Sequence, residues 1–259
     1  MGFVGGALGY HALRASESLM KWYYGGEPGL MDGSAYAGKS KMEVLLGTEI
    51  WTEIAGKTVL DFGCGSGSES VDMALHGAQR VVGLDILEKS LQQAREDAAT
   101  QGVSDICEFT THTNEKFDVV LSFDAFEHYG DPAGVLRTMA GLIKPDGKVI
   151  VSFGTPWYHP LGGHTFSVFP WAHLIFTERA LIRWRSDFKT DGATKFCEVE
   201  GGLNQMTIAR FERLIKESPF EFVSLRVVPI RALRRFANRW TREFTSSTLR
   251  CRLQLRKPV

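Results

Sequence analysis

The chain has 259 residues, which is enough for one large domain or for one domain with a sizeable insertion. Hydrophobic residues make up 44% of it, which excludes an intrinsically disordered chain. Lysine plus arginine and aspartate plus glutamate balance at 30 each, so the overall charge predicts neither a nucleic-acid partner nor an acidic one.

The N-terminal part is predicted to form two helices joined by a glycine-rich loop. The first covers residues 1–24, and its spacing places Leu8, Ala12, Ala15 and Leu19 on one side. The second covers 39–54, and the loop between them is flanked by three tyrosines that are candidates for closing over a ligand, namely Tyr23, Tyr24 and Tyr36. The N-terminus has no basic region followed by a long apolar run, and the cysteines are scattered, so we expect a cytoplasmic protein.

Strand and helix patterns then alternate. Short apolar runs predict strands over 58–62, 80–84, 106–110, 117–123 and 149–153. Helical spacing predicts helices over 68–76, 87–98 and 135–143, and Lys-Pro-Asp-Gly at 144–147 predicts a turn. This alternation is typical of an α/β fold in which a doubly wound, mostly parallel sheet is covered on both faces.

The rhythm breaks over residues 154–204, which are rich in aromatic residues, glycine and proline and are interpreted as an insertion after the fifth strand. It resumes with a helix over 207–216, a strand over 221–228, a helix over 231–242 and a strand over 248–255. The predicted organisation is therefore N-terminal helices and a cap loop (1–56), a ligand-binding core (57–153), a substrate lid (154–204) and a C-terminal completion of the sheet (205–259).

Positive charge is concentrated near the C-terminus. The stretch from Arg226 to Val259 holds ten basic residues and one acid, Glu243, so it carries about +9 and the rest of the chain about −9. The predicted helix 231–242 would have two faces, one with Arg231, Arg235, Arg239 and Arg242 and the other with Leu233, Phe236, Ala237 and Trp240. Two interpretations stay open: peripheral contact with an anionic membrane, or a surface helix with a solvated basic face, which we favour.

The most informative motif joins the first strand to the helix after it. Gly63, Gly65 and Gly67 follow the strand, so the backbone can approach a ligand and the next helix presents free N–H groups. Asp85 ends the second strand, where a carboxylate can accept hydrogen bonds from both hydroxyls of a ribose.

The glycine spacing separates this motif from a dinucleotide site. The dinucleotide fingerprint is G-x-G-x-x-G, and counting from Gly63 its third glycine would fall on Ser68. An acid, Asp61, precedes the glycines instead, and it suits a ligand that carries a positive amino group and no pyrophosphate.

Four blocks resemble a known family in order and spacing: LDFGCGSGS at 60–68, Asp85, FDVVLSFDAFEHYGDP at 117–132 and LIKPDGKVIVSF at 142–153. The chain resembles S-adenosylmethionine (SAM)-dependent methyltransferases of class I with a Rossmann-like fold, nearest to the branch of ubiquinone- and menaquinone-pathway methyltransferases. The resemblance covers residues 57–153. It implies a seven-stranded sheet with the last strand antiparallel, SAM as cofactor and S-adenosylhomocysteine as product.

The resemblance also implies roles for single residues. The glycine motif that holds the methionine part of SAM corresponds to Asp61, Gly63, Cys64, Gly65 and Gly67. The ribose-binding acid and its apolar neighbour correspond to Asp85 and Ile86, and the end of the fourth strand, which opens onto the methyl group, to Phe123 and Asp124. A frequent Glu-His pair just beyond corresponds to Glu127 and His128. The chain departs from the family after the third strand, where the acid for the adenine amine is missing and Thr111, His112 or a backbone group would substitute.

Histidines are the candidates for proton transfer. His128 is either a general base, because imidazole titrates near neutrality, or a structural residue before the next helix. In the insertion, His159, His164 and His173 are open to three interpretations: a substrate pocket, packing of the lid, or a metal site, for which the spacing matches no zinc pattern. The aromatic residues between 166 and 176 either line an apolar acceptor site or form the insertion's own core.

The sequence thus predicts a methyltransferase that acts on a small molecule, with oxygen as the first candidate acceptor atom ahead of nitrogen or carbon. A nucleic-acid methyltransferase is the main alternative, but Ser-Phe-Asp-Ala at 122–125 stands where base-amine methyltransferases carry Asn-Pro-Pro-Tyr. An NAD-dependent oxidoreductase is disfavoured by Ser68. A SAM-binding protein without catalysis also remains open.

Overall fold

The computed structural model describes residues 2–23, 40–164, 166–167, 169–187, 189, 192–198 and 202–257, and for 19–23 the backbone alone. Tyr24, Tyr36 and the side chain of Tyr23 therefore lie outside the described residues.

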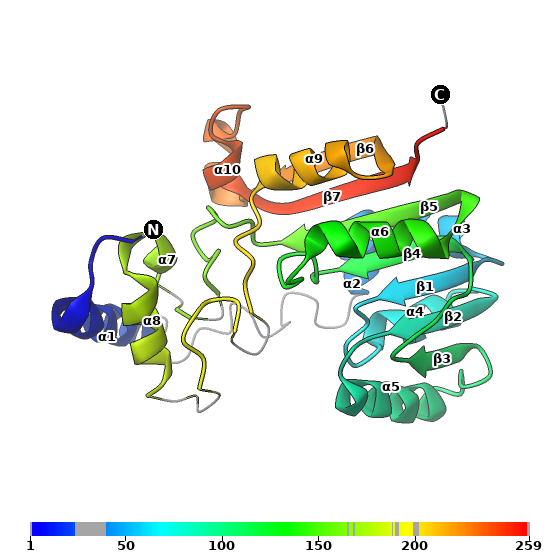
Figure 1. The fold of residues 1–259 in the computed structure, drawn as a ribbon, viewed down its shortest axis with the longest axis horizontal. Helices are drawn as coiled ribbons and strands as arrows, with labels where there is room; N and C mark the ends of the chain where they lie inside the picture. The colour runs from blue at the N-terminus through cyan, green and yellow to red at the C-terminus, as the bar shows by residue number, and fades with distance from the viewer. Residues whose placement is uncertain are drawn as a thin grey trace.

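A seven-stranded sheet with the order β3-β2-β1-β4-β5-β7-β6 forms the centre of the fold (Figure 1). Its strands are β1 (Thr58–Phe62), β2 (Arg80–Leu84), β3 (Cys107–Thr110), β4 (Phe117–Phe123), β5 (Ile143–Gly154), β6 (Phe220–Pro229) and β7 (Ser246–Leu255). Only β7 runs antiparallel, pairing with β5 and β6, which confirms the predicted sheet. The predicted turn at 144–147 lies within β5, where pairing with β4 skips from Ile143 to Lys148.

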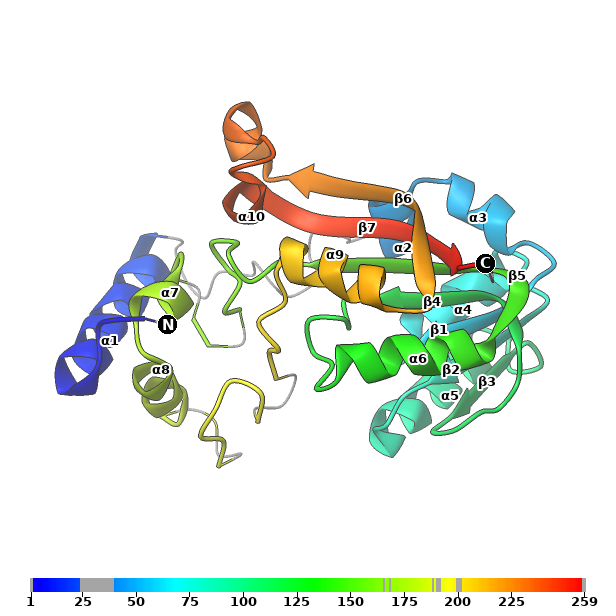
Figure 2. The same cartoon turned by 45° about the horizontal axis from the view of Figure 1, so that its top comes forward.

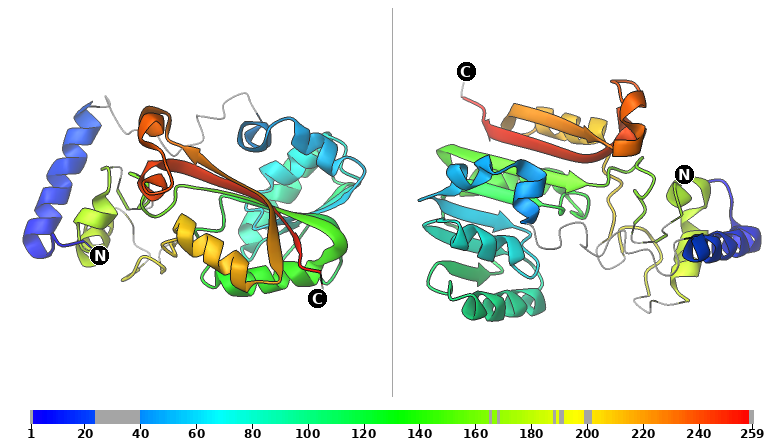
Figure 3. Two further views of the ribbon diagram at one scale, coloured as in Figure 1. Left: turned by 90° about the horizontal axis from the view of Figure 1, so that it is seen from above. Right: turned by 180° about the vertical axis from the view of Figure 1, so that it is seen from behind.

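Helices cover both faces of the sheet because successive strand residues point to opposite sides (Figure 3). Val59 packs with α2 (Lys41–Leu46), α3 (Glu49–Ile54), α4 (Ser68–Leu75) and α5 (Glu88–Thr100). Its neighbour Leu60 belongs to the opposite core, with α6 (Pro132–Leu142) and α9 (Ile208–Glu217). The runs that read as continuously apolar are thus buried on both faces, as predicted.

A second, smaller unit, here called the cap, consists of α1 (Gly6–Tyr23), α7 (Ala172–Ile175) and α8 (Glu178–Arg185). It lies beyond the carboxyl ends of the parallel strands (Figures 1 and 2). Its core contains Leu13 of α1 and Leu181 of α8, and the backbone of Val4 bridges to that of Phe176. The N-terminal segment and the insertion therefore fold together.

Two details of the predicted N-terminal helices are wrong. The helix expected over 39–54 is broken, because Gly47 ends α2 with a φ of 86°, which other residues rarely adopt. On α1 the side with Leu8 and Ala15 is not the side that packs: both residues are exposed, whereas Leu13 and Glu17 are buried against the insertion.

The helix predicted over 231–242 does not form either. A short 3-10 helix, η2 (Arg231–Phe236), is followed by a turn and by the single-turn helix α10 (Arg242–Thr245). The reason is local: Asn238 Oδ1 accepts hydrogen bonds from the backbone N of Trp240 and of Thr241, and so competes with helix formation.

Candidate active site

The glycine turn lies at the carboxyl end of β1, and its glycines differ in what they provide. All have positive φ. A Cβ on Gly65 would meet nothing within 4 Å, so the turn is open on that side. A Cβ on Gly67 would lie 2.6 Å from Ala94 and 2.7 Å from Phe109. Gly65 thus leaves room for a ligand, whereas Gly67 is required for packing.

Asp85 borders this open side. Its Oδ2 accepts a hydrogen bond from Gly65 N at 2.9 Å, and its Oδ1 accepts one from Leu87 N at 2.9 Å. The carboxylate is therefore fixed between the glycine turn and the start of α5. The next residue, Ile86, is 89% exposed, which places a bare apolar side chain beside the fixed carboxylate.

Asp61 lies beneath the turn and is almost completely buried. Ser70 Oγ donates a hydrogen bond of 2.6 Å to it. Burial and the nearby Glu69 raise the pKa of Asp61 to about 7. A cationic ligand would lower this pKa again. Cys64, also buried, has a raised pKa through burial and is not poised as a nucleophile.

Lys41 is a site residue that the sequence analysis missed. Its Nζ lies 2.9 Å from Asp124 and 3.1 Å from Glu69. Burial alone would lower the pKa of Lys41, but these two carboxylates raise it above the ordinary value. The sequence does contain a signal for the position of Lys41 at the start of a helix. Ser40 and Glu43 have the Ser-x-x-Glu spacing of a capping box, and Ser40 Oγ accepts a hydrogen bond from Glu43 N.

Asp124 ends β4 in an unusual backbone conformation. Its φ is 41°, in the left-handed region, and its N–H donates to Ser152 O at 2.8 Å. Strain of this kind tends to occur at functional sites. This backbone conformation directs the side chain of Asp124 toward Lys41. The preceding residue, Phe123, is buried in the core.

The structure brings His128 and His164 together, with ring centroids 5.5 Å apart. His128 Nδ1 donates to Gly202 O at 3.1 Å, which leaves its Nε2 as the proton-accepting nitrogen. His164 Nδ1 is hydrogen-bonded to Thr155 Oγ1 at 3.0 Å. Burial and the neighbouring His128 lower the pKa of His164 to about 4, so its ring is neutral.

The other histidines of the insertion have structural contacts. His159 Nδ1 accepts a hydrogen bond from Leu161 N at 2.9 Å, and His173 Nε2 donates to Trp157 O. Burial lowers the pKa of each to about 4. Of the aromatic residues between 166 and 176, Phe166 and Phe176 lie in the cap's core, which supports the second of the two interpretations given for them.

Tyr129 and Asn204, which the sequence analysis missed, stabilise the segment after β4 through hydrogen bonds. Tyr129 donates its hydroxyl hydrogen to Phe62 O at 2.9 Å, and this hydroxyl would be 2.8 Å from a Cβ on Gly63. Asn204 Nδ2 donates to Phe126 O and Tyr129 O, both at 2.8 Å. The end of the insertion is thereby tied to the loop that carries His128.

Glu127 differs from its neighbour His128. It is fully buried, and its Oε2 has no hydrogen-bond partner in the part of the chain that the structure describes. Burial and Asp124 raise its pKa well above the ordinary value. A buried carboxyl oxygen without a partner is costly, so it indicates a group held for a purpose other than stability.

After β3, where the adenine contact is missing from the sequence, Thr110 O accepts from Asp85 N at 3.3 Å and so brings the strand end to the candidate site. Thr111 and His112 are exposed there. Within the described ranges, no three His, Cys, Asp or Glu side chains are arranged to hold a metal ion.

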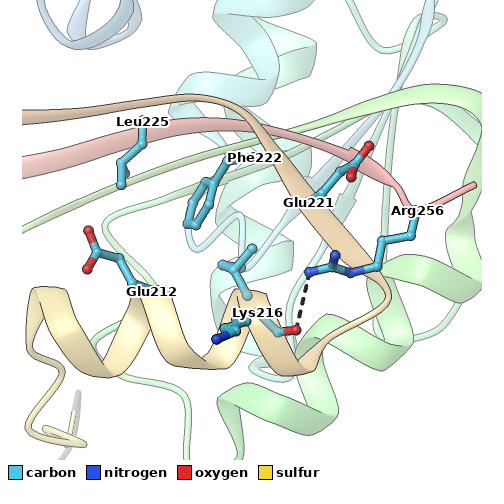
Figure 4. A pocket seen from close by; sticks show the side chains of 7 residues that line it. Glu212, Lys216, Glu221, Phe222, Leu225 and Arg256 are labelled. Atoms are coloured by element: carbon cyan, nitrogen blue, oxygen red, sulfur yellow. Dashed lines mark hydrogen bonds between the residues drawn. The ribbon is translucent and has the colours of Figure 1, made fainter.

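A cavity of about 360 Å³ lies elsewhere, between α9 and β6 (Figure 4). Its walls include Phe222, Leu225 and Glu212, none of them near the glycine turn. This cavity is therefore separate from the candidate site.

Comparisons with known proteins agree with this geometry. Residues 54–161 match the family model of a methyltransferase domain. The chain is 42% identical over 107 residues to a ubiquinone biosynthesis O-methyltransferase of Neisseria meningitidis, with 39% of this chain and 45% of the relative covered. It is 43% identical over 105 residues to the protein of that name from Bordetella bronchiseptica, with 38% and 43% covered. The chain thus matches less than half the length of these curated relatives.

Solved structures show the same fold. A SAM-dependent methyltransferase from Mesorhizobium loti has a TM-score of 0.51 at 20% identity, covering 78% of this chain and 92% of that one. The [4+2]-cyclase SpnF has a TM-score of 0.55 at 15% identity, with both chains covered completely. Together with the sequence matches, these structures confirm the predicted resemblance to SAM-dependent methyltransferases. No helix in the described ranges is long and apolar enough to span a membrane.

Proposed function

We propose that this protein is a SAM-dependent methyltransferase that methylates an oxygen atom of a small molecule. The observation that carries the proposal is the open, carboxylate-lined glycine turn, which lies inside the segment that matches a methyltransferase domain. The name of the curated relatives, ubiquinone biosynthesis O-methyltransferase, supports oxygen as the acceptor atom.

The residues around the turn fit SAM, which carries a sulfonium, an ammonium, a carboxylate and a ribose. Asp85 binds the two ribose hydroxyls, with Ile86 against the adenine. Asp61 and Asp124 attract the positive groups, and carboxyl groups beside the turn suit this ligand better than the pyrophosphate of a dinucleotide. Lys41 supplies the cation for the carboxylate. Thr111, His112 or the backbone beside them meets the adenine amine.

His128 is the proposed general base. When bound, SAM supplies a methyl group on a sulfonium whose sulfur keeps the electron pair as the carbon–sulfur bond breaks. His128 takes the acceptor's proton at Nε2, since Nδ1 is held by Gly202 O. Neutral His164 packs edge-to-face against its ring. His159 is less suited, because its Nδ1 already accepts a hydrogen bond from the backbone.

An imidazole base restricts the chemistry of the acceptor. A phenolic hydroxyl, with a pKa of about 10, gives its proton to imidazole far more readily than an alkyl alcohol does. We therefore expect a phenol or an enol, covered by the insertion 154–204 and the N-terminal segment acting as a lid. This small-molecule acceptor is the only partner that the proposed function requires.

Fold alone does not establish methyl transfer, since one neighbour of this fold is named a cyclase. Calorimetric titration with SAM, S-adenosylhomocysteine and NADH, followed by incubation of methyl-labelled SAM with a set of phenols, tests the proposal. We expect both sulfur compounds to bind, NADH not to bind, and label to appear in at least one phenol. Binding without transfer to any small acceptor would favour a SAM-binding protein without catalysis, and binding of NADH alone would contradict the cofactor.

A further inference from the structure

The connection between β6 and β7 exposes three large aromatic side chains. Phe236 is 66% exposed, Trp240 is 79% exposed and Phe244 is 46% exposed. Single exposed apolar residues are common on protein surfaces, but a group of aromatic rings in one short segment indicates a contact surface.

Arginines accompany these rings. Four of them are exposed: Arg231, Arg234, Arg235 and Arg239. Arg239 lies over the ring of Trp240, 4.4 Å from its centroid. None of the four forms an ion pair with a carboxylate in the described part of the chain. Glu243 does not compensate them, because its oxygens accept from Ile208 N at 3.0 Å and Ala209 N at 2.7 Å.

Hydrogen bonds hold this segment in shape. Asn238 Oδ1 accepts from Trp240 N at 2.8 Å and from Thr241 N at 3.2 Å. Thr241 Oγ1 in turn accepts from Asn238 N at 3.0 Å and donates to Phe236 O. The turn therefore presents Phe236 and Trp240 outward in a fixed arrangement, so little ordering entropy is lost on contact.

The segment lies at the same edge of the sheet as the candidate active site. In Figures 1 and 2, η2 and α10 project from the body of the protein at the end of the sheet toward which β4 and β5 run. The ring of Phe244 lies 4.9 Å from that of Tyr158, which belongs to the insertion. A surface bound by this tip would therefore face the side on which the acceptor enters.

We propose that residues 231–244, the aromatic–arginine tip, dock the protein on an anionic phospholipid membrane. The tip projects from the body of the protein and exposes Phe236 and Trp240, so it is suited to enter the interface of a bilayer, where tryptophan is enriched. The exposed arginines complement negatively charged headgroups. Residues 231–244 hold five arginines and one acid, Glu243, so the tip carries about +4 and is attracted to an anionic surface.

Sedimentation of the full chain with phosphatidylcholine vesicles, with and without about one third phosphatidylglycerol, tests the proposal. We expect binding to the anionic vesicles. The pair Phe236→Ala and Trp240→Ala, and separately the pair Arg234→Gln and Arg235→Gln, should each weaken it by about tenfold or more. Matched controls on the exposed part of β6, Val223→Ser and Arg226→Gln, should bind as the parent protein does.

Equal binding by parent and tip variants would overturn the proposal, and so would binding to a DNA or RNA oligonucleotide with none to vesicles. Calorimetric titration with SAM in the same samples keeps the two proposals separate. Tip variants that bind SAM normally but leave the vesicles support docking, whereas a parent protein that binds vesicles but not SAM contradicts only the proposed function.

Discussion

The core of residues 57–153 and the cap differ in how the sequence encodes them. In the core, Val59 and Leu60 are buried on opposite faces, and most partners of a strand come from the next strands along the chain. The cap depends on distant contacts: Val4 bridges to Phe176, and Leu13 of α1 packs with Leu181 of α8. Local patterns therefore describe the core, whereas the cap forms only once the N-terminal segment meets the insertion.

The two regions also differ in charge. The core side of the site is rich in carboxyl groups, such as Asp61, Asp85 and Asp124, and suits a cation. The cap side contributes His164 with a pKa lowered to about 4, and hence a neutral ring beside His128. We infer that the core binds the cofactor, whereas the cap and the insertion determine which acceptor binds and where its proton goes. This is a division of roles between the two regions.

The largest effect that would test this division is expected from His128→Ala. Loss of a general base typically lowers kcat by about 10²–10⁴-fold. SAM affinity should stay unchanged, because the ring of His128 is hydrogen-bonded to Gly202 O and not, among the described residues, to the glycine turn. Steady-state kinetics and calorimetry on one preparation measure both. His11→Ala, an exposed histidine on α1, serves as control. Full activity of His128→Ala would reduce this residue to a packing role.

Asp85→Ala should affect cofactor binding, the role inferred for the core. Removing a carboxylate that accepts two hydrogen bonds from a ligand is expected to weaken SAM binding by about 10²-fold. Calorimetry measures the affinity, and circular dichroism shows whether the sheet is intact. Asp105→Ala, an exposed acid before β3, is the matched control and should bind normally. Unchanged affinity of Asp85→Ala would remove the ribose role and leave this carboxylate as a cap for Leu87 N.

The sequence predicted the sheet because each strand is a short apolar run. It predicted the glycine turn because three closely spaced glycines after a strand, Gly63, Gly65 and Gly67, are typical of a turn that approaches a ligand. Residues whose position depends on contacts distant in sequence were not predicted. Lys41 gains its place from Asp124 and Glu69, and Asn204 from carbonyls near His128. The prediction failed again over 231–242, where the arginine spacing matched a helix but the side chain of Asn238 bonds the local backbone.

Acidification offers a smaller effect that sharpens the comparison. His159, His164 and His173 have pKa values lowered to about 4 from 6.5. Because the unfolded chain takes up protons on these rings first, their contribution to stability is complete above about pH 6.5 and is lost as the pH falls toward 4. Asp61 has the opposite sign: its pKa is raised from 3.8 to about 7, so its protonation in the folded core adds to stability as the pH falls from 7 to 3.8.

We therefore expect the insertion, including α7 and α8 of the cap, to unfold locally before the core as the pH falls from 7 to 5. Amide hydrogen exchange, corrected for its intrinsic pH dependence, should show opening of α7 and α8 increase by a few-fold while β1 and β4 stay protected. His173→Gln should reduce this pH dependence, since a neutral amide replaces one titrating ring. Equal loss of protection in both regions would mean that the cap and the core unfold as one unit. The proposed division of roles would then not be accompanied by a difference in stability.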